Sequence, residues 1–177
     1  SEDQLLYHAI GVFPEDVAVP QRVVIRLWRQ LDPQLTEYDA NELAVDLARL
    51  ALIDRNAEDE TITLHDLLHD YTRSKLSDNL EATHRSLLSA YNPENLEWWK
   101  IEHDGYLYFQ LGYHLIGAGY LQDFIDLIIG QPDWMEAKFV ACQGDVAFVA
   151  DLDFAMRQYS DPLTPSEAQI VNQLYVA

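Results

Sequence analysis

The sequence predicts a mainly α-helical protein with one small β-hairpin in its first half and an array of helices in its second half. Three observations favour this fold class. Apolar residues recur three and four positions apart through most of the chain, which is typical of helices. Residues 52–64 instead alternate between apolar and polar side chains, which indicates paired strands. Hydrophobic residues make up 49% of the 177 residues, enough for one ordinary domain or two small ones.

Helices are expected first at residues 2–12, 20–31 and 39–51. Pro20 is suited to the first position of a helix, because the N–H that proline lacks has no partner there. Asp39 followed by Glu42 resembles a capping box, so the third helix is expected to begin at Asp39. Each of these segments carries an apolar stripe that would pack against the others.

A β-hairpin is expected next, with strands at residues 52–55 and 61–64 and a polar turn between them. Three helices followed by a hairpin is the layout of a winged helix-turn-helix unit, in which the hairpin is the wing. We therefore predict a winged-helix domain over residues 1–78.

The remaining segments are all predicted to be helical, at residues 65–75, 81–91, 105–116, 121–129, 133–141, 145–159 and from 164 onward. Thr164, Pro165 and Glu167 supply a cap, a first-turn proline and a carboxylate that can bond back to the cap. His114 lies in an apolar run and is expected to be a hydrogen-bonded core histidine. Short helices joined by short loops predict an α-solenoid-like array, assigned to a helical domain of residues 79–177.

The charge balance argues against nucleic acid as a partner. Eleven basic and thirty acidic residues give a net charge of -19, which repels a phosphate backbone. A winged-helix DNA-binding transcriptional regulator is the alternative function, with residues 41–50 as its recognition helix. Arg49 would be the single cation of that helix, beside Glu42 and Asp46, so this alternative is disfavoured.

A cytoplasmic location is expected from two further features of the sequence. No apolar run is long enough to span a bilayer, so no membrane partner is expected. Cys142 is the single cysteine, which excludes an internal disulfide and fits a reducing compartment. Its apolar neighbours predict a buried, inert thiol.

Three hypotheses compete for the polar run from Leu64 to Asp70. The first is a zinc site, because His65 and His69 are four residues apart, as in H-E-x-x-H hydrolases. Asp66 would replace the usual glutamate and no third ligand follows at a matching spacing, so no metal site is expected. The second is structural, with Asp66 as a helix cap and His65 as a buried, hydrogen-bonded histidine. The third assigns His65 to a ligand and depends on a family resemblance.

Residues of the first half keep the order and spacing of a known domain: Tyr7, Phe13-Pro14-Glu15-Asp16, Pro20, Leu27-Trp28, Leu50, Leu52-Ile53, Thr63-Leu64-His65-Asp66-Leu67 and Asp70-Tyr71. On these residues the chain resembles the winged-helix domain of the NB-ARC (apoptotic ATPase) family of signalling ATPases. Leu64-His65-Asp66 takes the place of the family's Met-His-Asp motif. Residues 79–177 resemble the helical domain of the apoptotic protease-activating branch of this family, on His84, Tyr91, Tyr113-His114-Leu115, Asp133-Trp134 and Ala137-Lys138.

The resemblance implies a regulatory segment of a larger, nucleotide-switched ATPase. In this family the winged helix closes over bound ADP, so His65 would contact an ADP phosphate and Asp66 would cap the helix that supports it. An imidazole N–H donating to a phosphate oxygen is a charge-assisted hydrogen bond. The chain has no G-x-x-x-x-G-K-[ST] phosphate loop, so no enzymatic activity is expected from it alone, and ADP or ATP would bind only in the full-length parent.

The resemblance also implies the partners of this segment. These are a nucleotide-binding domain and a small helical domain upstream in the same chain, and a C-terminal sensor such as a β-propeller or repeat array. The parent would be able to assemble into an oligomer. The helical domain is expected to be truncated at its C-terminus.

Overall fold

The chain folds into two units, Ser1–Pro93 and Glu94–Ala177, in the computed structural model, which describes residues 2–159 and 163–176. Helices dominate both units, and the first also contains a small antiparallel sheet. The predicted mainly α fold class is therefore confirmed. No helix within the described ranges is both long enough and apolar enough to cross a membrane.

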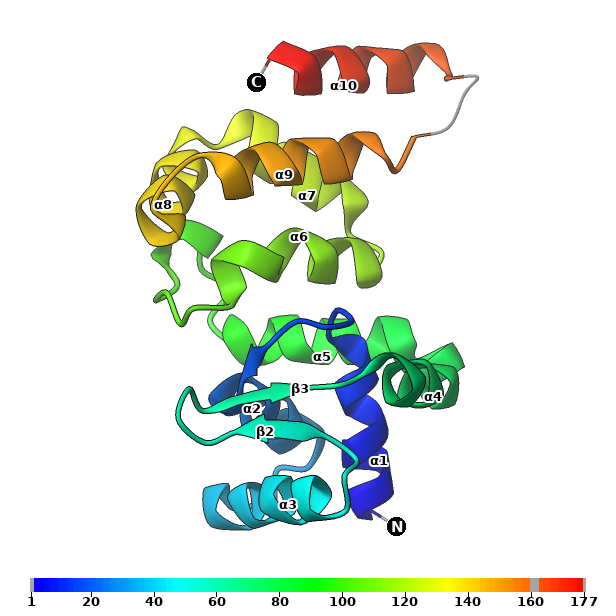
Figure 1. The fold of residues 1–177 in the computed structure, drawn as a ribbon. Coiled ribbons are helices and arrows are strands. Elements are labelled where there is room, and N and C mark those ends of the chain that lie inside the picture. Colours follow the sequence, from blue (N-terminus) through cyan, green and yellow to red (C-terminus); the bar gives the residue numbers. More distant parts are fainter. Residues whose placement is uncertain (1, 160–162, 177) are drawn as a thin grey trace. The chain divides into compact units, whose positions relative to one another are not determined.

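The first unit has the predicted order of helices followed by a hairpin (Figure 1). Its elements are α1 (Glu2–Ala9), η1 (Ile10–Val12), β1 (Val19–Pro20), α2 (Gln21–Leu31), α3 (Glu37–Arg49), β2 (Asp54–Asn56), β3 (Thr61–Thr63), α4 (Asp66–Leu76), η2 (Ser77–Asn79) and α5 (Leu80–Tyr91). The strand order is β1-β3-β2, with antiparallel pairing on both sides of β3. The two-residue strand β1 was not predicted, because so short a segment has no periodicity of its own.

Two predicted helix starts are wrong. Pro20 is the N-cap residue of α2 and pairs with Thr61 in the sheet, so the helix begins one residue later. The third helix begins at Glu37, because Thr36 and not Asp39 is its N-cap: Asp39 N donates to Thr36 Oγ1 at 3.1 Å. Threonine followed three residues later by an acid is itself a capping box, so two overlapping signals competed here.

The core of the first unit forms around α2. Val23, Val24, Leu27 and Trp28 are fully buried, as the apolar stripe predicts. The indole Nε1 of Trp28 donates to the carbonyl oxygen of Leu6 at 2.7 Å, which joins α2 to α1.

Gly11 allows η1 to approach α4 closely. A Cβ atom at this position would lie 2.6 Å from Arg73 N and 2.7 Å from Thr72 Oγ1, much closer than van der Waals contact. Thr72 is fully buried, so neither group has room to move away. The missing side chain of Gly11 therefore allows the close packing of η1 on α4, the helix that begins at Asp66, the last residue of the Leu-His-Asp motif.

Helix α5 belongs to the first unit, where it packs on α2. The guanidinium of Arg26 in α2 lies 4.3 Å from the centre of the Tyr91 ring in α5. The unit consequently extends to Pro93, whereas the predicted domain boundary falls at residues 78 and 79. That boundary remains a prediction.

Truncation tests this boundary. A fragment of residues 1–93 is expected to unfold cooperatively, and a fragment of residues 1–78 to be several kcal/mol less stable, because it loses Leu87 and Leu88, each worth about 1.5–3 kcal/mol when buried. Both side chains are at most 6% exposed in the structure. Urea unfolding followed by circular dichroism measures the difference. Equal stability of the two fragments would favour the boundary at residues 78 and 79.

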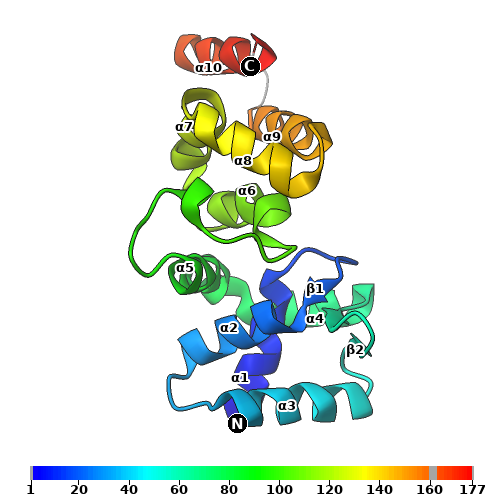
Figure 2. The same cartoon turned by 90° about the vertical axis from the view of Figure 1, so that its left-hand side faces the viewer.

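The second unit is an array of helices (Figure 2). Its elements are η3 (Trp98–Lys100), α6 (Leu107–Gly117), α7 (Leu121–Gly130), α8 (Pro132–Cys142), α9 (Val146–Met156) and α10 (Pro165–Val176). Helix α6 contacts α7, α8 and α9, as its nearly continuous apolar surface predicts. All five expected helices are present, with ends shifted by a few residues.

Local capping explains where two of these helices begin. The carboxylate of Asp104 accepts hydrogen bonds from Tyr106 N at 3.0 Å and Leu107 N at 2.9 Å, which delays the start of α6 past Gly105. For α10 the predicted capping box is confirmed. Thr164 N donates to the Glu167 carboxylate at 2.8 Å, and Glu167 N donates to Thr164 Oγ1 at 3.3 Å.

Candidate functional site

The Leu-His-Asp motif connects strand β3 to helix α4. Ile62 and Leu64 are buried, at 1% and 5% exposure, and Thr63 between them faces the other way, because side chains alternate along extended backbone. His65 is the next residue in this alternation, and its side chain is 68% exposed. The alternation therefore aims the imidazole of His65 away from the core of its own unit.

The contacts of His65 within its unit are weak. Its Nε2 atom lies 3.9 Å from an Asp54 carboxylate oxygen on β2, and that side chain is 66% exposed. A pair at this distance in water contributes little to stability. The imidazole is thus held only loosely by its own unit and is exposed to solvent.

Asp66 does not cap α4, so that prediction is wrong. The N-cap residue is His65, which makes no side-chain capping bond, and Asp66 is the first residue of the helix. A carboxylate at this position still favours the helix, because the first turn carries a partial positive charge. Carboxylate oxygens of Asp66, Glu15 and Asp16 lie within 4.8 Å of one another, and all three residues are exposed.

The buried, hydrogen-bonded histidine of the polar run from Leu64 to Asp70 is His69 and not His65. His69 is 5% exposed, and its Nε2 lies 2.9 Å from the Phe13 carbonyl oxygen. This contact requires Nε2 to carry the proton, since a carbonyl oxygen only accepts. Its Nδ1 is buried without a hydrogen-bond partner. His65 at the surface and His69 in the core do not share an open face, so the zinc hypothesis has no geometric support.

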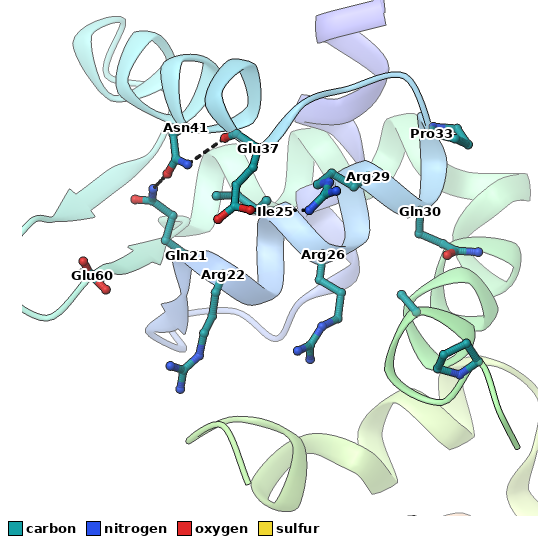
Figure 3. Close-up of a pocket in the computed structure, with 12 residues that line it drawn as sticks. Gln21, Arg22, Ile25, Arg26, Arg29, Gln30, Pro33, Glu37, Asn41 and Glu60 are labelled. Atoms are coloured by element: carbon teal, nitrogen blue, oxygen red, sulfur yellow. Dashed lines mark hydrogen bonds and ion pairs between the residues drawn. The ribbon is translucent and has the colours of Figure 1, made fainter. Parts of the chain in front are cut away.

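A groove on the first unit is lined by a row of arginines that the sequence reasoning missed. Arg22, Arg26 and Arg29 extend from α2 into a space of about 670 Å³. Figure 3 shows the side chains of Arg22 and Arg26 on the same side of the helix, and Arg29 turned towards Glu37. Their spacing of four and three residues indicates that they share one face of a helix. The sequence analysis considered only the acidic charge of the whole chain and did not use this spacing.

Comparison with known proteins identifies the second half of the chain. Residues 80–175, more than half of the chain, match the APAF-1 helical domain. The chain belongs to the APAF-1 helical-domain family. It is also 26% identical over 138 residues to apoptotic protease-activating factor 1 of Rattus norvegicus, an alignment that covers 75% of this chain. The chain spans 10% of the length of that relative.

The APAF-1 helical-domain region contains a buried ion pair that was also missed. Lys138 of α8 has no exposed side-chain surface and is bonded to the carboxylate of Asp151 in α9, which is 8% exposed. Burial raises the pKa of Asp151 from 3.8 to about 6, although the charge and the hydrogen bond of Lys138 lower it. The Lys138 ammonium lies 5.6 Å from the ring centre of Trp134, which itself stacks on Tyr108 at 5.0 Å.

Two histidines of the APAF-1 helical-domain region are buried. His114 lies 2.7 Å from the hydroxyl of Tyr106 through its Nε2, which confirms the prediction of a hydrogen-bonded core histidine. His84 is 1% exposed, and burial, with a smaller effect of Arg73, lowers its pKa to about 4. His84 is therefore neutral at physiological pH.

Cys142 is the last residue of α8. The sequence predicted a buried thiol, but the residue is only half-buried. Burial raises the pKa of its thiol. A raised pKa disfavours the reactive thiolate, which agrees with the expected inert character.

Proposed function

We propose that this chain is the regulatory segment of a larger apoptotic signalling ATPase, and that its winged-helix part closes over ADP bound elsewhere in the parent. The APAF-1 helical-domain match and the similarity to apoptotic protease-activating factor 1 support this assignment. On this proposal the segment has no catalytic activity of its own. The nucleotide-binding and small helical domains lie upstream, the helical domain connects to a C-terminal sensor, and the parent assembles into an oligomer.

The observation that carries the proposal is the exposure of His65. Its imidazole is 68% exposed at the point where β3 meets α4, on a loop whose other motif residue, Leu64, is anchored in the core. This arrangement leaves an N–H donor for an acceptor outside the unit. A phosphate oxygen is such an acceptor, and the resulting bond would exist only when the parent is closed.

The test is the rate at which the full-length parent releases ADP. His65→Leu is expected to speed ADP release about ten- to a hundred-fold, because a hydrogen bond to a charged group contributes about 1.5–3 kcal/mol. The same substitution in the 177-residue chain alone should leave its stability nearly unchanged, because the side chain is exposed. Stopped-flow release of a fluorescent ADP analogue measures the first effect, and thermal unfolding measures the second.

The matched control is Leu67→Ala, in the first turn of the same helix, where the side chain is 85% exposed. ADP release is expected to stay at the parental rate in this variant. His69→Ala is unsuitable as a control, because it removes a buried contact with Phe13 and would disturb the fold. Equal ADP release from the parent, His65→Leu and Leu67→Ala would refute the assignment of His65 as a phosphate contact.

A further inference from the structure

A second groove on the first unit has a mostly apolar lining. Its volume is about 450 Å³, within the common range for ligand sites, about 300–1,000 Å³. Residues of α1 and α5 make up most of the lining, together with residues at the ends of α2 and α4. We call it the leucine groove, after Leu5, Leu6, Leu31 and Leu76.

The four leucines form a buried floor and an exposed rim. Leu6 and Leu76 are 4% and 7% exposed, whereas Leu5 and Leu31 are 68% and 40% exposed. A single exposed leucine on a protein surface is ordinary, but these two border the same concave surface. An apolar side chain placed in the groove would remove both from water, and the free energy gained grows with the apolar area that is covered.

The polar residues on α5 do not offer hydrogen bonds to a ligand. The hydroxyl of Thr83 donates to the carbonyl oxygen of Asn79 at 2.8 Å, and the hydroxyl of Ser86 donates to that of Ala82 at 3.0 Å. A hydroxyl has one proton to donate, so both donors are already used. Ala9 and Ala82 also line the groove, and their small side chains leave room for a larger apolar one. The lining therefore favours an apolar ligand over a polar one.

The length of the groove fits a short helix. Glu2, Leu5, Leu6 and Ala9 line it from α1, at positions i, i+3, i+4 and i+7, which span a rise of about 10.5 Å. An amphipathic helix carries its own apolar residues at the same spacing and places them in grooves of this kind. A partner helix of two turns or more can therefore follow the groove along α1.

Charge indicates what flanks the apolar residues of this partner. Glu2 and Asp32 are the charged residues of the lining, and both are acidic. Within residues 2–159 and 163–176 neither carboxylate has an ion pair, although Asp32 Oδ1 accepts the backbone N–H of Gln34 at 2.9 Å. Arg85 on the neighbouring surface of α5 is paired with Glu81. Lysine or arginine beside the apolar residues of a partner would complement these two carboxylates.

We propose that the leucine groove binds a basic amphipathic helix of a partner protein, with apolar side chains against Leu5 and Leu31 and basic side chains beside Glu2 and Asp32. A second copy of this chain is a poor occupant, because a net charge of -19 makes two copies repel each other. The same charge repels nucleic acid. This proposal does not depend on the role of His65.

The test measures binding of two labelled peptides to the 177-residue chain by fluorescence anisotropy. The first peptide has about four helical turns, with leucines three and four positions apart and with lysine and alanine elsewhere. The second has the same composition, but its leucines are distributed around the helix. Physiological ionic strength limits non-specific attraction between a basic peptide and the acidic chain. The first peptide is expected to bind at least tenfold more tightly than the second.

Variants of the groove separate the apolar contact from general attraction. Leu5→Ala removes a rim side chain, and its matched control is Leu50→Ala, because Leu50 is 69% exposed and lies outside the groove. Ala82→Gln fills part of the groove from an exposed position on α5 without adding charge. Leu5→Ala and Ala82→Gln are each expected to weaken binding of the first peptide about tenfold, and Leu50→Ala to leave it unchanged. Circular dichroism verifies that each variant is folded.

A second pair of variants tests the charge. Asp32→Asn removes a negative charge and keeps an oxygen that can accept the Gln34 N–H. It is expected to weaken binding about two- to threefold at low salt and to have no effect at high salt. The matched control is Asp70→Asn, an exposed position in α4 outside the groove, which should leave binding unchanged.

Three outcomes would overturn the proposal. Equal binding of the two peptides would show that charge alone attracts them. Equal affinities of Leu5→Ala and Leu50→Ala for the first peptide would place its binding site elsewhere. Sedimentation that shows a dimer of the wild-type chain, dissociated by Leu5→Ala and not by Leu50→Ala, would assign the groove to a second copy instead.

Discussion

Replacing Lys138 by methionine is expected to lower the free energy of unfolding by about 3–5 kcal/mol, the usual cost of removing one partner from a buried ion pair. Methionine keeps most of the side-chain length, so little packing is lost. The carboxylate of Asp151, 8% exposed, would remain buried without its counter-charge. Urea unfolding of the 177-residue chain near pH 8 measures the loss.

The loss should depend on pH in a defined direction. In the wild-type protein the pKa of Asp151 is raised from 3.8 to about 6, so between these values the folded state binds a proton more readily than the unfolded chain. The stability that folding gains from protonated Asp151 is fully present below pH 3.8 and is lost as the pH rises through about 6. Without Lys138 the pKa of Asp151 rises further, so the Lys138→Met variant continues to lose stability with rising pH beyond the range in which the wild-type protein does. The variant should therefore differ more from wild type near pH 8 than near pH 5.

Two further variants control this experiment. Lys100→Met breaks an exposed pair in the same unit, in which Lys100 and Glu97 lie 2.8 Å apart and are 56% and 50% exposed. Solvent screening makes the effect of this substitution on the free energy of unfolding small. The double variant Lys138→Met/Asp151→Leu removes both buried charges and should regain most of the stability. A stability difference between wild type and Lys138→Met that is the same at both pH values would exclude Asp151 as the responsible group.

Trp28→Ala is expected to destabilise the first unit by about 3–5 kcal/mol, because it empties a large volume in a close-packed core. Trp28 has no exposed surface, and its indole N–H also satisfies the carbonyl oxygen of Leu6. Trp28→Phe should lower the free energy of unfolding less, since it keeps most of the ring and loses only the hydrogen bond to Leu6, which is worth about 0.5–1.5 kcal/mol.

The matched control for Trp28 is Gln30→Ala, two residues along the same helix, where the side chain is exposed. This substitution is expected to change the free energy of unfolding by no more than about 0.5 kcal/mol. Denaturant midpoints of the three variants, followed by circular dichroism, provide the comparison. If Trp28→Ala were no more harmful than Gln30→Ala, the core assigned to α2 would be wrong.

The sequence by itself determined the features that depend on neighbouring residues. The order of helices and hairpin follows from apolar periodicity, which is a local property. The start of α10 follows from Thr164 and Glu167, which are three residues apart and bond to each other. The outward direction of His65 agrees with the alternation that begins at Ile62 and Leu64, although the sequence alone also left a buried His65 open as an alternative.

The tertiary structure decided what depends on contacts between distant residues. His69 is buried because helix α4 packs where its imidazole meets Phe13, 56 residues earlier. Lys138 and Asp151, 13 residues apart, become an ion pair only when α8 and α9 pack together. The arginine groove on α2 likewise needs α3 and α5 to complete its walls. A buried charge and an exposed charge have the same local pattern, and only the packing that removes water from one of them separates the two.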